Sequence, residues 1–139
     1  MREVQVAAAM AADGEFVLIL KDKASSMAVP IWIAEPEFFS ALHAWRNWRY
    51  PRPLTHDLLR SVLDVGQMRV ERVEVTEVKE HIFYAKVVVA GNSGEPKVLD
   101  ARPSDAVALA LRVGAPIFVA EEVFSQAGIE WDLHKILLR

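Results

Sequence analysis

The 139-residue sequence contains no cysteine, which excludes disulfide bonds, thiolate metal sites and a cysteine nucleophile. This absence is typical of proteins from a reducing compartment. Asparagine and glutamine are scarce, with two and three residues, a bias seen in heat-adapted proteins. No apolar run approaches the roughly 18 residues of a membrane span. The start also lacks the basic-then-apolar layout of a signal peptide. We therefore expect a cytoplasmic protein with no membrane segment.

Several sequence motifs of known chemistry are also missing. There is no glycine-rich phosphate loop, no G-x-S-x-G nucleophile motif and no H-E-x-x-H metal motif. The net charge is -3, which argues against a surface coated in positive charge for nucleic acid. A local basic patch remains compatible with that total.

The composition is that of an ordinary globular protein, with 53% apolar and 25% charged residues. The length fits one domain over 1–139, and no linker or low-complexity segment divides it. A chain of this size buries a core without disulfide or metal support. We expect a single compact domain.

The hydrophobic pattern predicts strands in hairpins and helices in clusters. A first hairpin spans 4–10 and 16–20 around an Asp-Gly turn, and a second spans 72–78 and 81–90 around a turn at 79–80. The second strand of that hairpin is apolar on both faces, which favours an interior position. Pro30 favours an edge position for a strand at 28–34. Further strands are expected at 97–101 and 115–120.

Four helices are expected, at 35–48, 54–66, 102–114 and 121–128. Thr55 is the predicted N-cap of the second helix and Gly66 its C′ residue. Pro103 suits the first position of the third helix, which Gly114 ends. Residues 129–139 form a tail of unassigned structure. The fold class is α+β, with a mostly antiparallel or mixed sheet.

Two segments nearly repeat each other, "PIWIAE" from Pro30 to Glu35 and "PIFVAE" from Pro116 to Glu121. One interpretation is a pair of buried strand-to-helix corners with an acid at each helix start, where the dipole favours it. We then expect both apolar stretches, 31–33 and 117–119, to build the sheet and core. The other interpretation is a symmetric site lined by the two acids. "RPLTHD" and "RPSD" form a weaker echo that is compatible with internal pseudo-symmetry.

The stretch "DARPSD" gathers polar residues at the entry to the third helix. Asp100 and Asp105 are candidate ligands of Mg²⁺ or Mn²⁺ or candidate activators of water, and Arg102 is a candidate for binding phosphate. The alternative is a structural Arg–Asp pair at a capped helix. His56, at the start of the second helix, is a candidate general acid or base, although an exposed polar residue at a helix start is also compatible.

The segment "WRNWRYPRP" combines arginine with aromatic residues, and no acid occurs between Phe38 and His56. Guanidinium groups bind phosphates and aromatic faces stack on bases. One interpretation of this pattern is a nucleic-acid contact formed by four residues: Arg46, Arg49, Arg52 and Trp48. The alternative is a helix end whose tryptophans pack on the core or on a partner subunit, covered by arginine through cation–π contact.

The motifs "PIWIAEPE", "RPLTHDLL", "FYAKVVV" and "DARPSDAVALALRVGAPIFVAEEV", in this order, resemble the bifunctional nuclease domain family over about 3–128. The resemblance implies a compact α+β domain, homo-oligomers such as a homodimer, and nuclease activity on both DNA and RNA. It carries over no settled set of catalytic residues. The family usually has glycine at Ala34 and small residues at Phe38 and Phe39, so the region of the first helix departs from the pattern.

Two functional hypotheses follow. The first is a nuclease that hydrolyses phosphodiesters in single-stranded DNA or RNA, with Asp100, Asp105, Arg102 and His56 in the site and with help from a divalent ion. The second is a non-catalytic homo-oligomeric or regulatory module in which the Arg–Asp cluster is a structural clamp. The sequence leaves both open.

Overall fold

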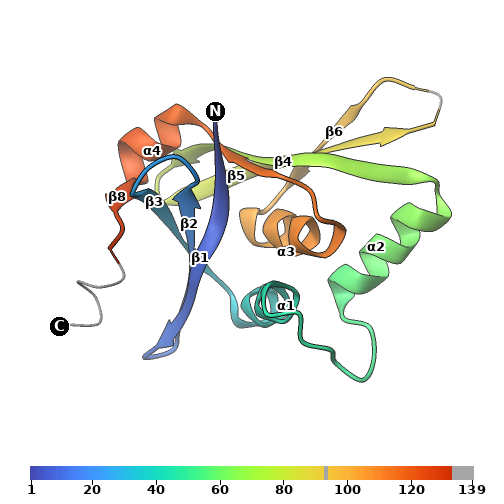
Figure 1. Ribbon diagram of the computed structural model, residues 1–139, viewed down its shortest axis with the longest axis horizontal. Coiled ribbons are helices and arrows are strands. Elements are labelled where there is room, and N and C mark those ends of the chain that lie inside the picture. The colour runs from blue at the N-terminus through green and yellow to red at the C-terminus, as the bar shows by residue number, and fades with distance from the viewer. Residues whose placement is uncertain (93, 133–139) are drawn as a thin grey trace.

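A computed structural model describes residues 1–92 and 94–132. It contains one eight-stranded sheet with the order β6-β5-β4-β7-β1-β2-β3-β8 and four helices (Figure 1). The strands are β1 (Arg2–Ala12), β2 (Glu15–Asp22), β3 (Met27–Ile33), β4 (Met68–Lys79), β5 (Ile82–Gly91), β6 (Lys97–Ala101), β7 (Ile117–Val119) and β8 (Ile129–Glu130). The helices are α1 (Glu35–Trp45), α2 (Thr55–Val65), α3 (Pro103–Val113) and α4 (Glu121–Ala127). The predicted α+β class is confirmed.

The sheet joins two antiparallel units through the short strand β7. This strand pairs antiparallel with β1 and parallel with β4, which is the one parallel pairing among the described strands. The expected interior position of β5 is confirmed, because it lies between β4 and β6. The edge character of β3 also holds, because β8 covers only Met27 and Ala28 and leaves Pro30 without an outer strand among the described residues.

Helix α3 occupies the centre of the molecule, beside α1 and α2 on one side of the sheet (Figure 1). Its residues Ala106, Val107, Ala108, Leu109 and Ala110 are all buried. Three of these are alanines, whose small side chains let the helix lie close to its neighbours. The core between the helices and the sheet also holds Leu18, Leu20, Val29, Ile31, Val73, Val75, Ile117 and Val119. This packing fixes where α3 begins, which matters for the site below.

The two repeated segments form the same corner twice. Ala34 and Ala120 are the N-cap residues of α1 and α4, and the predicted strand-to-helix corners are therefore confirmed. One part of the core prediction was wrong, because Trp32 is 60% exposed. Successive side chains of a strand point to opposite faces, so burial of Ile31 against the helices turns Trp32 away from them.

The turns differ from the predictions by one or two residues. The turn of the second hairpin is formed by Glu80 and His81, both at positive φ, and not by 79–80, because the tight hairpin turn needs two left-handed residues in succession. Leu54, and not Thr55, is the N-cap of α2. Gly66 is the C-cap residue at φ -77°, and the left-handed residue after the helix is Gln67.

Two helix-end predictions agree with the structure. Pro103 is the first residue of α3, and Gly114 ends it in the left-handed conformation at φ 72°. Helix α1 ends at Trp45, three residues before the predicted end. No helix within 1–92 and 94–132 is long and apolar enough to cross a membrane. The part of the predicted tail at 133–139 lies outside the described residues.

Candidate functional site

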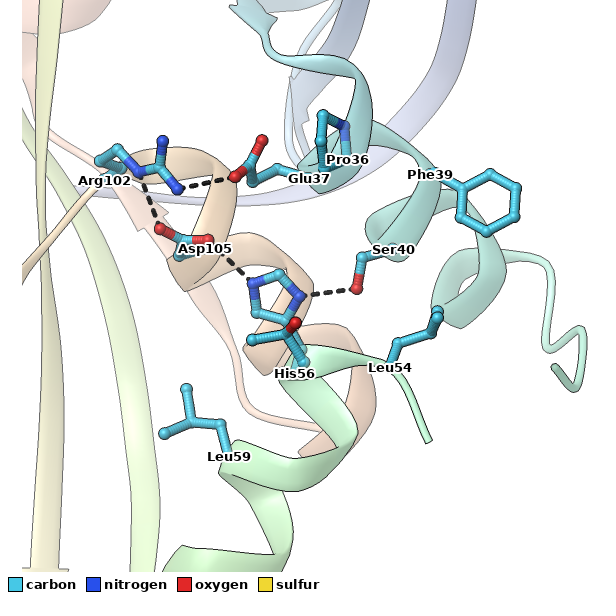
Figure 2. Close-up of a pocket in the computed structure, with 10 residues that line it drawn as sticks. Pro36, Glu37, Phe39, Ser40, Leu54, His56, Leu59, Arg102 and Asp105 are labelled. Atoms are coloured by element: carbon cyan, nitrogen blue, oxygen red, sulfur yellow. Dashed lines mark hydrogen bonds and ion pairs between the residues drawn. The ribbon is translucent and has the colours of Figure 1, made fainter. Parts of the chain in front are cut away.

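A pocket of about 530 Å³ lies where α1, α2 and α3 begin. Residues from the first two turns of these helices line it, together with the N-cap residues of α2 and α3, and Figure 2 shows them converging from three separate ribbons. The lining residues are Pro36, Glu37, Phe39, Ser40, Leu54, Thr55, His56, Leu59, Arg102 and Asp105. The positive dipole ends of α2 and α3 therefore lie at this cavity, an arrangement that favours a bound anion.

A continuous chain of polar contacts crosses this pocket (Figure 2). Ser40 Oγ lies 2.6 Å from His56 Nδ1, and His56 Nε2 lies 2.9 Å from Asp105 Oδ1. Arg102 Nε donates to Asp105 Oδ2 at 2.9 Å, and its terminal nitrogen donates to Glu37 Oε1 at 2.8 Å. Five side chains from three helices thus form one network, which we call the polar relay.

The partners of His56 determine its tautomer. A carboxylate only accepts hydrogen bonds, so Nε2 carries the proton that is donated to Asp105. In the neutral imidazole Nδ1 is then an acceptor, and the Ser40 hydroxyl donates to it. A hydroxyl that donates to an imidazole held by a carboxylate is the arrangement that activates serine nucleophiles.

Asp105 is held in its charged form. Burial by itself raises the pKa of this carboxyl, but hydrogen bonds from His56 and Arg102 outweigh it, and the pKa lies below its ordinary value. The carboxylates of Asp105 and Glu37 in turn raise the pKa of the Arg102 guanidinium above its ordinary value. The site therefore keeps fixed charges on both sides of the Asp105–Arg102 contact, next to His56.

Arg102 is both paired and accessible. It is the N-cap residue of α3, and its side chain remains 64% exposed while it contacts two carboxylates. Glu37 uses one oxygen for Arg102, and its Oε2 atom is buried with no hydrogen-bond partner among residues 1–92 and 94–132. The guanidinium therefore has a solvent-facing part that a phosphate oxygen can approach.

Local sequence explains why His56 reaches the pocket. The Asp57 carboxylate accepts from the Leu54 backbone at 2.8 Å, which closes the first turn of α2. The same carboxylate accepts from Arg112 of α3 at 2.7 Å, and the Arg112 side chain is only 5% exposed. Asp57 thereby locks the start of α2 onto α3. His56, the preceding residue, is placed between the helices and is 5% exposed.

The structure brings three of the predicted residues together and leaves one apart. His56, Arg102 and Asp105 belong to the polar relay. Asp100 lies on edge strand β6, exposed and opposite Lys86 in the register. Within the described part of the chain it forms no hydrogen bond or ion pair with the relay, and it does not line the pocket. The strand conformation before Arg102 carries Asp100 away from the helix start.

The donor set does not match the metal site that we predicted from Asp100 and Asp105. Both oxygens of Asp105 accept hydrogen bonds from relay partners, and both nitrogens of His56 are in use. No three His, Asp or Glu residues within 1–92 and 94–132 are grouped in a way that would hold a metal ion. Hard divalent ions prefer several oxygen ligands. We derive no step through a metal ion for this reason.

Sequence reasoning missed Ser40 and Glu37. They lie three residues apart on α1, so they share the helix face that turns toward α3. The available signal was a lone serine inside the apolar run "FFSAL", because a buried polar residue needs a partner. Glu121, the acid of the second corner, instead pairs with Arg2 at 2.9 Å. Glu35 of the first corner is exposed and outside the pocket lining.

The loop after α1 is built by a helix-terminating motif. The Trp48 backbone donates to His43 O at 2.8 Å and the Asn47 backbone to Ala44 O at 3.2 Å, with Asn47 left-handed at φ 55°. This is the pattern of a Schellman turn, in which asparagine tolerates the left-handed position. The turn projects Trp48 away from the core, and its side chain is exposed.

Aromatic rings connect this loop to the pocket. Phe39 lines the pocket, and its ring lies 4.1 Å from that of His43 and 5.9 Å from that of Tyr50. The His43 ring also lies 5.6 Å from Trp48. We call these four residues the ring cluster. Three of them, Phe39, Trp48 and Tyr50, expose much of their surface, which leaves faces free for stacking.

The arginines around the ring cluster have no carboxylate partners. Arg46, Arg49, Arg52 and Arg60 are exposed and form no ion pair with any described residue. Arg46 lies over the rings of Trp45 and Trp48, so part of the cation–π alternative holds. The other described arginines, Arg2, Arg69, Arg72, Arg102 and Arg112, all pair with acids. Among the described residues, the arginines without an ion pair therefore all lie between 46 and 60.

Comparison with known proteins identifies the family of this chain. The sequence pattern of the bifunctional nuclease domain matches residues 18–132. The chain belongs to the bifunctional nuclease domain family. The match includes every residue of the polar relay and of the ring cluster. The expected family membership is confirmed.

Relatives within the family differ in what is known of them. An uncharacterised protein of Mycobacterium tuberculosis is 38% identical over 113 residues, which is 81% of this chain and 66% of that protein. Bifunctional nuclease 1 of Oryza sativa subsp. japonica is 28% identical over 116 residues, which is 82% of this chain and 35% of that protein. Bifunctional nuclease 1 of Arabidopsis thaliana is 26% identical over 105 residues, 74% of this chain and 32% of that protein. The chain therefore spans about two thirds of the mycobacterial relative and about one third of the plant ones.

Proposed function

We propose that this chain is a nuclease that hydrolyses phosphodiester bonds in single-stranded DNA or RNA. The observation that carries the proposal is the position of His56, which joins the Ser40 hydroxyl to the Asp105 carboxylate in a pocket that Arg102 also lines. A nucleophile, a base and a phosphate-binding cation then lie within one cavity, as hydrolysis requires. The name of the plant relatives gives the same reaction class.

The chemistry can be assigned atom by atom. His56 Nδ1 takes the proton of the Ser40 hydroxyl while Ser40 Oγ attacks phosphorus. The P–O bond to the leaving nucleoside breaks, and that oxygen receives the proton back from His56. A water molecule, deprotonated by His56 Nδ1, then attacks the phosphorus of the phosphoserine. The bond between Ser40 Oγ and phosphorus breaks, Ser40 Oγ takes the proton back from His56, and the second product leaves with its phosphate. Asp105 keeps the imidazole in the required tautomer and stabilises its charged form.

Arg102 and the helix starts supply electrostatic stabilisation. The exposed part of the Arg102 guanidinium is available to the phosphate oxygens on which negative charge gathers in the transition state. Two carboxylates fix its position beforehand, so little reorganisation accompanies the reaction. Glu37 acts as a positioning residue through Arg102. Divalent-ion assistance stays a prediction to be tested by adding and chelating Mg²⁺ or Mn²⁺.

The strand is guided into the pocket by the ring cluster and by the unpaired arginines. Phe39 lines the pocket and contacts Tyr50, so bases stacked on these rings would bring a neighbouring phosphate to Arg102. Arg46, Arg49 and Arg52 contact the phosphate backbone. We expect binding to weaken steeply with salt, because each neutralised phosphate releases counterions. The absence of cysteine fits action in the cytoplasm.

The decisive experiment is a cleavage assay with purified wild type and the Asp105→Asn variant. Single-stranded DNA and RNA are the substrates, each with Mg²⁺, with Mn²⁺ and with EDTA. Asp105→Asn presents the wrong group to His56 and is expected to abolish cleavage in every condition. Equal cleavage by the variant would assign the activity to another site or to a contaminant, and the proposal would be withdrawn.

A non-catalytic module remains the second candidate, and one observation favours it. Leu58, Val62 and Val65 form an exposed apolar stripe on α2, separate from the pocket. Exposed apolar faces of this kind are typical of protein–protein interfaces, in which the partner subunit buries them. In that case the polar relay clamps the three helices together and the stripe forms a homodimer. The same stripe is compatible with a dimeric nuclease, so we propose a homodimer under either function.

A further inference from the structure

A second pocket, of about 370 Å³, lies at the other end of α1. The end of α1, the loop after it, the middle of α2 and the end of α3 surround it. The lining residues that could contact a ligand are His43, Asn47, Trp48, Arg49, Tyr50 and Arg60. Leu54 lines both pockets, and the ring cluster lies between them.

The charge of this second pocket is strongly positive. Its only acid, Asp57, is already neutralised by Arg112 at 2.7 Å. Arg49 forms no hydrogen bond or ion pair within the described residues, and Arg60 donates only to the backbone oxygen of Arg112, at 2.9 Å. Two guanidinium groups therefore face one cavity without a counter-charge. Guanidinium forks of this kind bind phosphate through paired, charge-assisted hydrogen bonds.

The neutral side chains of the pocket match the rest of a nucleotide. Trp48 and Tyr50 offer exposed rings on which a base can stack. His43 Nδ1–H donates to Phe39 O at 2.9 Å, which orients the ring and leaves Nε2 available to a ligand. Asn47 supplies an amide at the rim. Cationic, aromatic and polar groups thus surround a volume that is enclosed on several sides by helices.

We propose that this second pocket binds the terminal phosphate monoester of a nucleic acid strand, so that the enzyme recognises a phosphorylated end and cleaves at the neighbouring first pocket. A terminal monoester carries nearly two negative charges and three free oxygens. A backbone diester carries one charge and two free oxygens, and it would leave one of the two unpaired guanidinium groups, Arg49 or Arg60, without a counter-charge. Cleavage near the bound end rests on the proposed nuclease function, whereas binding of the terminal phosphate does not.

The two pockets lie within reach of one strand. Phe39 lines the first pocket, and His43, one helical turn later, lines the second. One turn advances about 5.4 Å along the helix axis, and stacked nucleotides rise by roughly 3.4 Å. A strand held by its end in the second pocket therefore places a bond near its end, and not one in its middle, beside the polar relay.

The test compares matched ends of one short single strand. The strand carries a 5′-phosphate, a 3′-phosphate, or hydroxyl groups at both ends, and its dissociation constant and initial cleavage rate are measured in 0.1 M salt. We expect one phosphorylated form to bind at least ~10-fold more tightly than the hydroxyl form. The arm that shows the preference identifies which end is recognised. Adenosine 5′- and 3′-monophosphate are titrated as separate probes of the pocket.

Three variants locate the preference. Arg49→Gln and Arg60→Gln remove a charge from the pocket and are expected to lower the preference to ~3-fold or less. Arg52→Gln is the matched control, because Arg52 is an unpaired arginine of the same loop that does not line the pocket. It is expected to weaken all strands alike and to keep the preference. Arg49 is exposed and makes no bond within the fold, so its variant tests the site without a folding risk.

The outcomes separate this inference from the nuclease proposal. Cleavage without an end preference, or a preference that survives the combined Arg49→Gln and Arg60→Gln changes, overturns the terminal-phosphate pocket and leaves the nuclease standing. Arginine-dependent binding of an end phosphate or of a mononucleotide without any cleavage supports the pocket and overturns the nuclease. Preference, its loss in the two pocket variants and its retention in Arg52→Gln support both.

Discussion

His56 Nε2 lies 2.9 Å from Asp105 Oδ1, although the two residues are 49 positions apart in the sequence. Each belongs to the first turn of its helix, α2 for His56 and α3 for Asp105, so the contact exists only because those helices start side by side. It fixes the tautomer that lets His56 accept from Ser40. The reactive part of the site therefore depends on how three helix starts are packed.

Removal of the Ser40 hydroxyl tests its role as nucleophile. Ser40→Ala is expected to lower the cleavage rate by about 10²–10⁴-fold while strand binding stays within ~2-fold, because only the reacting atom is lost. Ser61→Ala serves as the control, because this variant removes a serine hydroxyl from the exposed surface of α2, away from the pocket. It should leave the cleavage rate unchanged. Retained cleavage in Ser40→Ala would show that His56 activates water directly.

Replacement of Arg102 distinguishes catalysis from a structural clamp. Its two ion pairs are partly exposed, and such pairs contribute about 1 kcal/mol or less each. The Arg102→Ala variant is therefore expected to unfold at nearly the same urea concentration as wild type but to lose most of its cleavage activity. Arg102→Lys, which keeps the charge and loses the fork, should recover only part of it. A large loss of stability together with unaffected substrate binding would favour the clamp.

Removal of Asp57 tests the ion pair that places His56. The Arg112 side chain is buried but that of Asp57 is 42% exposed, so loss of this carboxylate leaves Arg112 with backbone partners at a cost of about 1–3 kcal/mol. We expect the free energy of unfolding of Asp57→Ala to fall by about that amount, measured by urea denaturation. Asp64→Ala, an exposed acid of the same helix, should change it by less than ~0.5 kcal/mol. Similar values for the two variants would mean that Arg112 is satisfied by its backbone bonds.

Acid should destabilise the fold through four carboxyl groups whose pKa is lowered, which are that of Glu121, bonded by Arg2, and those of three aspartates. Bonds from the Ala24 backbone and Ser25 lower the pKa of Asp22, while bonds from Leu54 and Arg112 overcome burial and lower that of Asp57. The pKa of Asp105 is lowered by His56 and Arg102. A group with a depressed folded-state pKa stabilises fully above its ordinary value, which is 3.8 for an aspartate, and loses this as pH falls through the folded-state value.

The contribution of these carboxylates to the free energy of unfolding is therefore expected to be constant above about pH 5 and to decline below about pH 4. Urea titrations at several pH values measure this slope. The Asp57→Asn variant should show a shallower decline than wild type, because the carboxyl group of Asp57, one of those with a lowered pKa, is no longer present to titrate. An equal slope in the variant would contradict the lowered pKa of Asp57.

The apolar stripe on α2 tests the homodimer. Val62→Lys places a charge between Leu58 and Val65 and is expected to convert a dimer into a monomer, as measured by light scattering after size-exclusion chromatography. Asp64→Lys changes the charge on the opposite side of the helix and should leave the mass unchanged. A wild type that is monomeric at high protein concentration would contradict the homodimer.

The site was only partly predictable from the sequence. "RPLTHD" and "DARPSD" contain His56, Arg102 and Asp105 because helix starts collect polar residues for local reasons, and such reasons are visible in a few consecutive letters. Asp100 belongs to the same motif but not to the relay. It lies on strand β6, where the direction of a side chain is set by the alternation between the two faces of the sheet and not by the start of α3. Ser40 carries only the weak signal of a lone serine in an apolar run, and Glu37 carries none, because their partners lie on another helix.

The sequence by itself determined the elements and their class. Alternating and helical apolar periods, Pro103 at a helix start, Gly114 at a helix end and the repeated corners at Ala34 and Ala120 are all properties of neighbouring residues. The tertiary structure decided which polar residues meet. The Ser40–His56–Asp105 contacts and the unpaired arginines around the second pocket depend on packing between helices far apart in the chain. Short-range patterns do not encode such distances, because they arise from burial of the whole core.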